Sequence, residues 1–141
     1  LIDEVAEALP ASRGKTERLL QRCIDCGMFG EKAYLDDAVL AADYVRNEMC
    51  DADGLLPFKN GVEQGIYAAI FAQYIIRLIE DGNQPQYMDW LRHNIDVAWN
   101  NRDVNRNVTF KDAAKPCPTG VMESYDASGC PALMQVISPF K

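Results

Sequence analysis

The residues best suited to chemistry gather at the start of a strongly apolar stretch, residues 61–79. An ammonium, two amides and a carboxylate lie within a few positions of one another, on Lys59, Asn60, Glu63 and Gln64. If the stretch is a helix, these groups lie where its first backbone N–H groups have no partner inside the helix. The pattern therefore predicts a helix whose N-terminal end carries polar groups that could bind a ligand or take part in a reaction.

The helix that follows this polar N-terminal end is expected to have no side that faces solvent. Between Ile66 and Ile76 the only strongly polar residue is Gln73. A helix that is apolar on all sides belongs in the interior of a larger structure. We expect the rest of the chain to be organised around it.

Other reactive side chains are scattered. His93, the only histidine, lies beside Arg92 on the expected wet face of a helix, and no serine or cysteine nucleophile motif is near it. Cys23 and Cys26 form a lone pair without a second pair or a histidine cluster, which favours packing over zinc binding. No set of His, Asp and Glu has ligand spacing, so we predict neither a metal nor a cofactor.

The chain has five cysteines with irregular spacing, which is not the pattern of a disulfide framework. Cys117 and Cys130 could close a loop as a disulfide or remain thiols. The sequence leaves both states open, and with them the redox compartment.

Length and charge narrow the classes of function. A chain of 141 residues suggests one domain, residues 1–141, that can bury a core. The net charge of −7 argues against a nucleic-acid partner, because binding phosphates needs a concentrated basic patch. Gln73 and Arg77 interrupt the longest apolar run, so we expect no membrane span.

Apolar residues recur with helical spacing along most of the chain, and no stretch alternates as a strand would. The fold class is therefore all-α. We expect helices over residues 2–9, 15–26, 34–49, 62–80, 85–102 and 130–138, with a long irregular segment over 103–125.

Two of these helices have clear inner and outer faces. In the helix over 34–49, three aspartates are expected to face water, and two of them to favour the helix dipole in the first turn. They are Asp36, Asp37 and Asp43, of which the first two lie in that turn. In the helix over 85–102, the residues expected to face inward are Met88, Leu91, Ile95, Ala98 and Trp99.

The helices alternate between half-buried and almost wholly apolar. Such alternation is what a double ring of helices requires, with a wet outer ring and a dry inner ring. In such a toroid the inner helices begin on one face, so that residues 10–16, 51–64 and 103–129 would meet at one mouth. A plain antiparallel bundle is the alternative.

An ordered series of phrases resembles the late part of glycoside hydrolase family 76, over about residues 31–137. The phrases are Tyr34-Leu35-Asp36-Asp37-Ala38, Ala42-Asp43-Tyr44-Val45, Asp51-Ala52-Asp53-Gly54-Leu55-Leu56-Pro57, Glu63-Gln64-Gly65-Ile66-Tyr67, Tyr87-Met88-Asp89-Trp90-Leu91, Asn94-Ile95-Asp96-Val97-Ala98-Trp99 and Tyr125-Asp126-Ala127-Ser128. This family comprises endo-α-1,6-mannanases and their relatives, built as an (α/α)6 toroid. The resemblance implies the C-terminal portion of a longer catalytic domain, part of such a toroid, and an extracytoplasmic location.

The resemblance also implies retaining hydrolysis of α-mannosidic bonds by two adjacent aspartates. Retaining chemistry needs two carboxyl groups about 5 Å apart. Asp36 and Asp37 are the only adjacent aspartates, but they begin an expected outer helix on the face opposite the mouth. We therefore expect the catalytic pair to be missing from this chain.

What remains is a contribution to a sugar site. Sugars stack an apolar face on an aromatic ring while carboxylates and amides bind their hydroxyl groups. Core packing of the aromatic residues and capping of helices by the polar ones are the structural alternatives. The expected substrate-binding residues are Phe58, Lys59, Asn60, Glu63, Gln64, Tyr67, Tyr125 and Asp126, with Glu123 beside them.

Two functions follow from these observations. The first is a piece of a glycoside hydrolase that acts on α-mannan and lines part of its sugar-binding cleft. The second is a non-catalytic helical module that binds carbohydrate or another protein. Because part of a toroid would expose apolar helix flanks, we also expect self-association, pairing with an N-terminal part, or closure into a smaller bundle.

Overall fold

The computed structural model describes residues 32–58, 60–61 and 66–137. The described part is all-α, as expected, and no β-strand occurs within these ranges. The expected helices over 2–9 and 15–26 lie outside them. The helices are α3 (Lys32–Tyr44), which continues into a π-helical turn (Val45–Met49), α4 (Ile66–Glu80), α5 (Met88–Asn100) and α6 (Gly129–Val136). Short 3-10 helices, Pro85–Tyr87 and Ser124–Ala127, precede α5 and α6.

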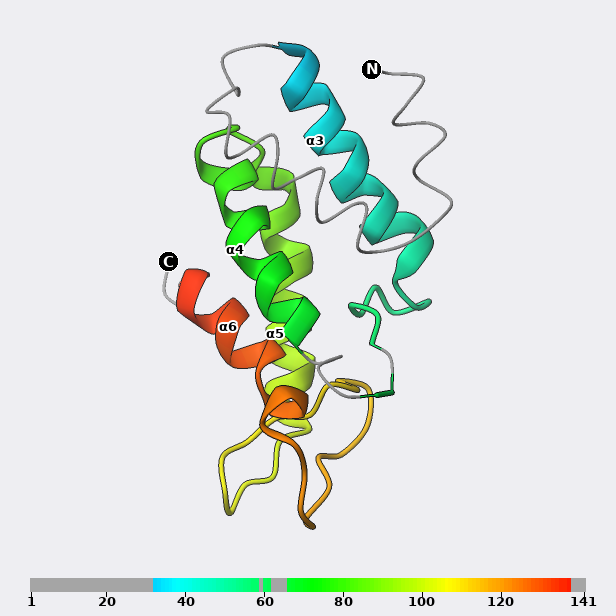
Figure 1. Ribbon diagram of the computed structural model, residues 1–141, viewed down its shortest axis with the longest axis vertical. Helices are drawn as coiled ribbons and strands as arrows, with labels where there is room; N and C mark the ends of the chain where they lie inside the picture. The colour runs from blue at the N-terminus through cyan, green and yellow to red at the C-terminus, as the bar shows by residue number, and fades with distance from the viewer. Residues whose placement is uncertain (1–31, 59, 62–65, 138–141) are drawn as a thin grey trace.

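The four α-helices alternate in direction. In Figure 1, α3 and α5 run downward, whereas α4 and α6 both begin at the lower end and run upward. Helix α6 packs along α4 and also contacts α5, while α3 contacts α4. The connections after α3 and after α5 therefore lie at the lower end, and the turn between α4 and α5 lies at the upper end (Figure 1).

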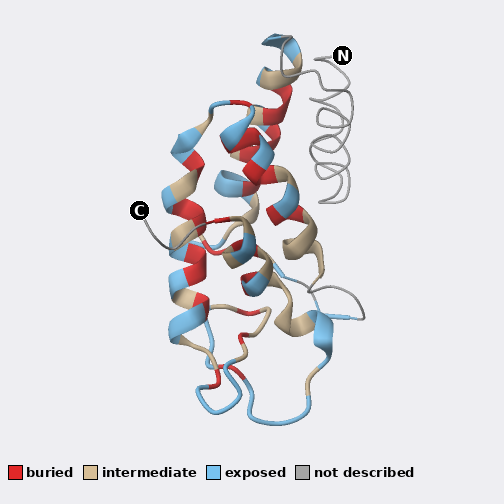
Figure 2. Ribbon diagram, turned by 90° about the vertical axis from the view of Figure 1, so that its left-hand side faces the viewer, coloured by how far each residue is buried: buried red, intermediate tan, exposed pale blue. Residues whose placement is uncertain are grey.

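The core lies between the helices, and the lower loops are mostly exposed (Figure 2). Tyr87 is fully buried, and its ring packs edge-on against Trp90. Its hydroxyl group donates a hydrogen bond of 2.8 Å to Asp43 Oδ1, which ties the start of α5 to α3. Burial, and then the Asp43 carboxylate, hold the pKa of Tyr87 well above its usual range. The phenol therefore stays a neutral donor at physiological pH.

Helix α4 is buried on most sides but has a narrow solvent face, which corrects the expectation that it has none. Gln73, Arg77 and Glu80 are exposed at helical spacing. Phe71, Ala72, Ile75, Ile76, Leu78 and Ile79 form its buried side. The first turn of the helix is only half-buried. Three polar residues among so many apolar ones suffice to make a wet stripe because they share one edge of the helix.

The turn after α4 depends on two small residues. Asn83 adopts a left-handed conformation with a φ of 52°, and the following N–H, on Gln84, donates to Ile79 O. Such a residue after the last turn is a common way to end a helix. At Gly82 a Cβ atom would lie 2.5 Å from the backbone oxygen of Leu78, so only glycine fits. Both residues lie between the helices expected over 62–80 and 85–102.

Two expectations for the helix over 34–49 are wrong. Asp37 is buried and Asp43 is half-buried under Tyr87, although both were expected to face water. The helix also begins earlier, at Lys32, so that Asp36 and Asp37 lie beyond its first turn. The favourable contact of these carboxylates with the helix terminus is therefore weaker than expected, because that effect fades after one turn.

The two tryptophans of α5 have unlike environments. Trp90 is buried, in agreement with a packing role. Trp99 was expected to face inward but is 37% exposed, and the Arg102 guanidinium lies 4.2 Å from the centre of its ring. An indole covered by a guanidinium gains a cation–π contact while its edge remains wet. None of the helices in the described ranges is both long enough and apolar enough to cross a lipid bilayer.

Candidate functional site

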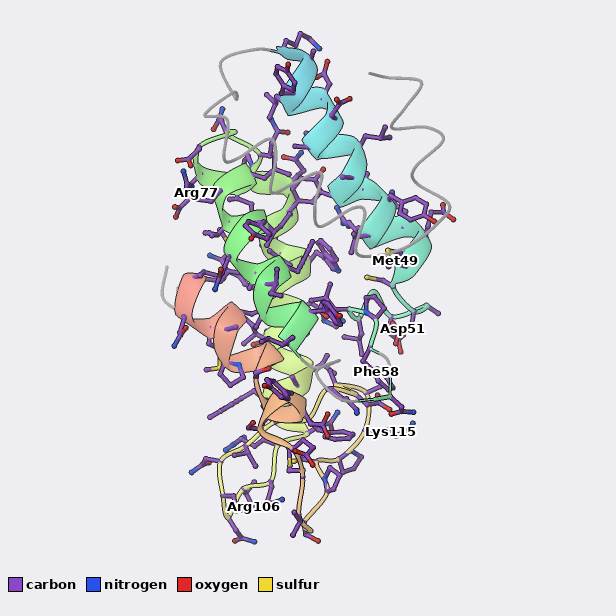
Figure 3. The ribbon with its side chains drawn as sticks, viewed as in Figure 1. Met49, Asp51, Phe58, Arg77, Arg106 and Lys115 are labelled. Carbon is purple, nitrogen blue, oxygen red and sulfur yellow. The ribbon has the colours of Figure 1, made fainter. Side chains whose placement is uncertain are left out.

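The segment after α3 is held in shape by its own aspartate. Asp51 Oδ1 accepts hydrogen bonds from the backbone N–H groups of Asp53 (3.0 Å) and Leu55 (2.8 Å). Gly54 completes the turn with a φ of 75°, a conformation in which glycine has no steric penalty. The turn directs the chain towards Phe58, which lies in the lower half of the molecule (Figure 3).

Three side chains of α5 hold this segment against the helix. Asn94 is buried, its Oδ1 accepts from Leu56 N (2.7 Å), and its Nδ2 donates to Gly54 O (3.0 Å). Trp90 Nε1 donates to the same Gly54 oxygen at 2.7 Å. His93 Nε2 lies 3.1 Å from Asp53 O, so the exposed histidine has a structural contact. The backbone ahead of Phe58 is therefore fixed by helix side chains.

The long segment after α5 is organised around a second aspartate. The carboxylate of Asp103 accepts from the backbone N–H groups of Asn105 and Arg106 and pairs with Arg106 Nε at 2.6 Å. The same guanidinium donates to the backbone oxygens of Pro118 and Gly120. Because one arginine joins residues 103–106 to residues 118–120, the segment has a defined shape despite its lack of regular structure.

Asp103→Asn is expected to lower the stability of the protein at neutral pH. The hydrogen bond from Arg106 holds the pKa of Asp103 below its ordinary value, so the stabilisation exists above the ordinary aspartate pKa and is lost as the pH falls through the lowered one. Urea unfolding as a function of pH should show the difference between variant and wild type shrinking in acid. Asp89→Asn, at a carboxylate whose side chain is 98% exposed, is the control. An Asp103→Asn deficit that persists unchanged in acid would contradict the assigned cause.

The charged pair in which both side chains are least exposed joins the long segment to the 3-10 helix before α6. Lys111 Nζ lies 2.9 Å from Asp126 Oδ1, and the two side chains are only 10% and 14% exposed. The ammonium also lies 5.7 Å from the centre of the Phe110 ring. A pair so little exposed is screened far less by water than a surface pair. It brings a carboxylate and an ammonium next to an aromatic ring.

A small cavity of about 40 Å³ opens beside this ion pair. Its walls come from the 51–58 segment, α4, α5, the long segment after α5 and α6, and they include Phe58, Ala68, Asn94, Phe110, Lys111 and Gly129. Most of the wall is apolar. The cavity has room for a few water molecules, whereas ligand pockets that enclose a small molecule measure about 300 Å³ or more. A sugar ring would therefore have to lie across its mouth.

The structure brings several of the expected sugar-binding residues to this end. Phe58 is 36% exposed and lines the cavity, and Asn60 is exposed nearby in the chain. Tyr67 lies half-buried in the first turn of α4, next to the cavity-lining Ala68. Tyr125 is 37% exposed in the 3-10 helix before α6, and Asp126 follows it. Glu123 is exposed at the start of that helix, and Lys59, Glu63 and Gln64 lie outside the described residues.

Neither Asp126, one of the polar residues for which helix capping was the alternative, nor Ser128 caps α6 with its side chain. Asp126 binds Lys111, and Ser128 lies at the N-cap of α6 without a side-chain bond to the helix. The Ser128 hydroxyl group instead donates to Tyr125 O at 2.8 Å. The Asp126 carboxylate is thus directed towards the cavity-lining lysine.

The adjacent aspartates lie at the opposite end. Asp36 and Asp37 are on the upper half of α3, far along the chain and in space from the loops at the lower end (Figure 1). Asp36 is exposed and pairs with Lys32, whereas Asp37 is buried. The exposed carboxylate of Asp36 and the buried carboxylate of Asp37 therefore do not lie on either side of the cavity.

Cys117 and Cys130 are free thiols and do not form a disulfide with each other. Cys117 Sγ lies 3.9 Å from Met122 Sδ. Cys130 lines the cavity, but burial raises its pKa to about 11, so it is a poor nucleophile at neutral pH. Within the described ranges, no three His, Cys, Asp or Glu side chains come together as metal ligands would.

Sequence reasoning missed three residues of this site. Asn94 had a detectable signal, because it lies one helical turn from Trp90 and Ala98 on the apolar face of α5. A polar residue in that position needs partners, and a nearby loop supplies them. Phe110 and Lys111 had no such signal, since they lie in an irregular segment, and Lys111 pairs with Asp126 only in the folded chain.

Comparison of the chain with known protein families and with curated proteins finds no match in either.

Proposed function

We propose that this chain is the C-terminal part of a glycoside hydrolase that acts on α-mannan, and that its lower end forms one wall of the sugar-binding cleft. The proposal rests on the ordered resemblance to glycoside hydrolase family 76. The observation that carries it is the convergence of Phe58, Lys111, Tyr125 and Asp126 at one end of the helices.

The direction of the helices supports a toroid in this proposal. The two most apolar helices, α4 and α6, begin at the same end and pack on each other, although α5 lies between them in the chain. In an up-and-down bundle the closest packing joins consecutive antiparallel helices. In a toroid, each inner helix packs against the next inner helix, which is the second one along the chain. In this proposal α4 and α6 are inner helices, and α3 and α5 are outer helices.

The chemistry of the lower end supports a sugar as the ligand. Phe58 and Tyr125 expose aromatic surface, and Lys111 and Asp126 offer a donor and an acceptor beside it. A pyranose ring has an apolar face and hydroxyl groups at its rim, so it satisfies both kinds of group at once. Because the cavity is too small to enclose a ring, the proposed saccharide lies across the mouth, with one face on the exposed aromatic residues.

In this proposal the described residues bind and orient the substrate, and none is assigned as catalytic. Retaining hydrolysis needs two carboxyl groups about 5 Å apart on either side of the scissile bond. Asp126 is held by Lys111, and Asp36 and Asp37 lie at the other end of the helices. In this proposal, bond cleavage therefore depends on carboxylates other than those of Asp36, Asp37 and Asp126.

Phe58→Ala is expected to weaken the binding of α-1,6-mannobiose about five- to tenfold, because an aromatic contact is worth about 1 kcal/mol. Titration followed by amide chemical shifts measures the dissociation constant. Leu40→Ala is the matched control, since Leu40 is 44% exposed on α3, away from the lower end. We expect that variant to bind like the wild type.

The same titration separates the two candidate functions. Shift changes confined to residues 56–58, 110–111 and 125–126 would support a mannan-binding wall. No shift change with mannobiose or with longer α-1,6-mannan fragments would remove the sugar site and favour a helical protein-interaction module.

A further inference from the structure

One dipeptide at the lower end combines an amide with an unhindered backbone nitrogen. Asn60–Gly61 is the only Asn–Gly pair in the sequence. Both residues are exposed, and Gly61 has a φ of 136°, in a region that side-chain-bearing residues rarely adopt. The hydrogen bonds from the Asn94 and Trp90 side chains reach Gly54 and Leu56, and Leu56 lies four residues before Asn60.

We propose that Asn60 is a site of spontaneous deamidation. The backbone nitrogen of Gly61 attacks the side-chain carbonyl carbon of Asn60, loses its proton, and expels ammonia to give a cyclic succinimide. Water then opens the ring at either carbonyl group. The products are aspartate, or isoaspartate with an extra methylene group in the backbone. Glycine favours the step because it has no Cβ atom to block the approach of its nitrogen to the side chain.

Asn105 and the two Asp–Gly pairs are protected by hydrogen bonds. At Asn105, the following nitrogen, on Arg106, donates to Asp103 Oδ1. At the two Asp–Gly pairs, which react through the same ring, Gly54 N donates to Asp51 O and Gly82 N donates to Arg77 O. A nitrogen engaged in this way is not free to attack.

Asn94 is protected in a second way. It is buried within α5, and its side-chain amide is hydrogen-bonded through both of its polar atoms. By contrast, the Gly61 N–H has no hydrogen-bond partner among the described residues. The reaction is therefore expected at Asn60 selectively, although the chain contains several other asparagines.

The modification changes the character of the site. It replaces a neutral amide with a carboxylate, and the isoaspartate form also lengthens the connection between Phe58 and α4. Asn60 is among the residues expected to bind sugar hydroxyl groups, so we expect the aged protein to bind α-1,6-mannobiose more weakly. That consequence rests on the proposed function, whereas the modification itself does not.

The test is to age the full chain at physiological temperature in mildly alkaline and mildly acidic buffers. Chymotryptic digestion after Phe58 and Tyr67 releases residues 59–67. Fragment masses then locate the exchange of NH₂ for OH, and digestion in heavy-oxygen water marks any deamidation that occurs during the digestion. Labelling by an isoaspartyl methyltransferase identifies the isoaspartate form.

We expect the exchange to appear at residue 60, to be faster in alkali because the attacking nitrogen must lose its proton, and to be at least about tenfold slower in Gly61→Ala. Peptides that contain Asn94 and Asn105 serve as internal controls. No exchange at residue 60, or an equal rate in a folded Gly61→Ala variant, would overturn the proposal. Exchange without any change in mannobiose affinity would leave the modification in place and count only against the sugar role of Asn60.

Discussion

Lys111→Met is expected to lower the free energy of unfolding by about 2–4 kcal/mol, because it leaves the Asp126 carboxylate little exposed and without its partner. Breaking an ion pair in such surroundings costs more than the pair contributes, since the remaining charge has lost its hydration. Urea unfolding of the variant at neutral pH measures the loss.

Two comparisons separate this cause from general damage. Lys32→Met removes the ammonium of an exposed pair, with side chains 84% and 58% exposed, and should cost no more than about 0.5 kcal/mol. The double variant Lys111→Met, Asp126→Leu should recover much of the lost stability, because it removes the unpaired charge. A double variant less stable than Lys111→Met would show that the lysine acts through packing rather than charge.

Asn94→Leu is expected to destabilise the protein by about 2–4 kcal/mol, although leucine has a similar volume and suits the apolar face of α5. The leucine removes the acceptor of Leu56 N and one of the donors to Gly54 O, and it leaves these backbone groups without those bonds. We also expect faster chymotryptic cleavage after Phe58, because the segment before it is no longer tied to the helix.

Asn100→Leu provides the control for this change. It makes the same substitution on the same helix at an exposed position and should alter stability by less than about 0.5 kcal/mol. Equal stability and equal cleavage rates in the two variants would show that Asn94 does not hold the segment in place.

The helices could be predicted because their signals are local. The apolar spacing over 62–80 and 85–102 predicted the end of α4 at Glu80 and the start of the next helical segment at Pro85. It was harder to predict which side of each helix is buried where a polar residue packs against a partner far away in the sequence. Asp43 is an example: it accepts a hydrogen bond from the Tyr87 hydroxyl group, and no sequence pattern within α3 predicts that contact.

The candidate site divides in the same way. The aromatic and acidic residues near the helix starts were visible in the sequence, and the orientation of α4 and α6 brings Phe58, Tyr125 and Asp126 to one end. The little-exposed Lys111 ammonium, the free thiols of Cys117 and Cys130 and the small size of the cavity could not be predicted from the sequence.

Spacing along the chain was enough to establish an all-helical protein with a largely apolar central helix, because helical periodicity depends on neighbouring residues alone. The pairing of Lys111 with Asp126, the anchoring of the 51–58 segment by Asn94 and the separation of Cys117 from Cys130 came from the folded chain. Contacts between residues far apart in sequence depend on how helices pack, and the same local pattern is compatible with more than one such packing.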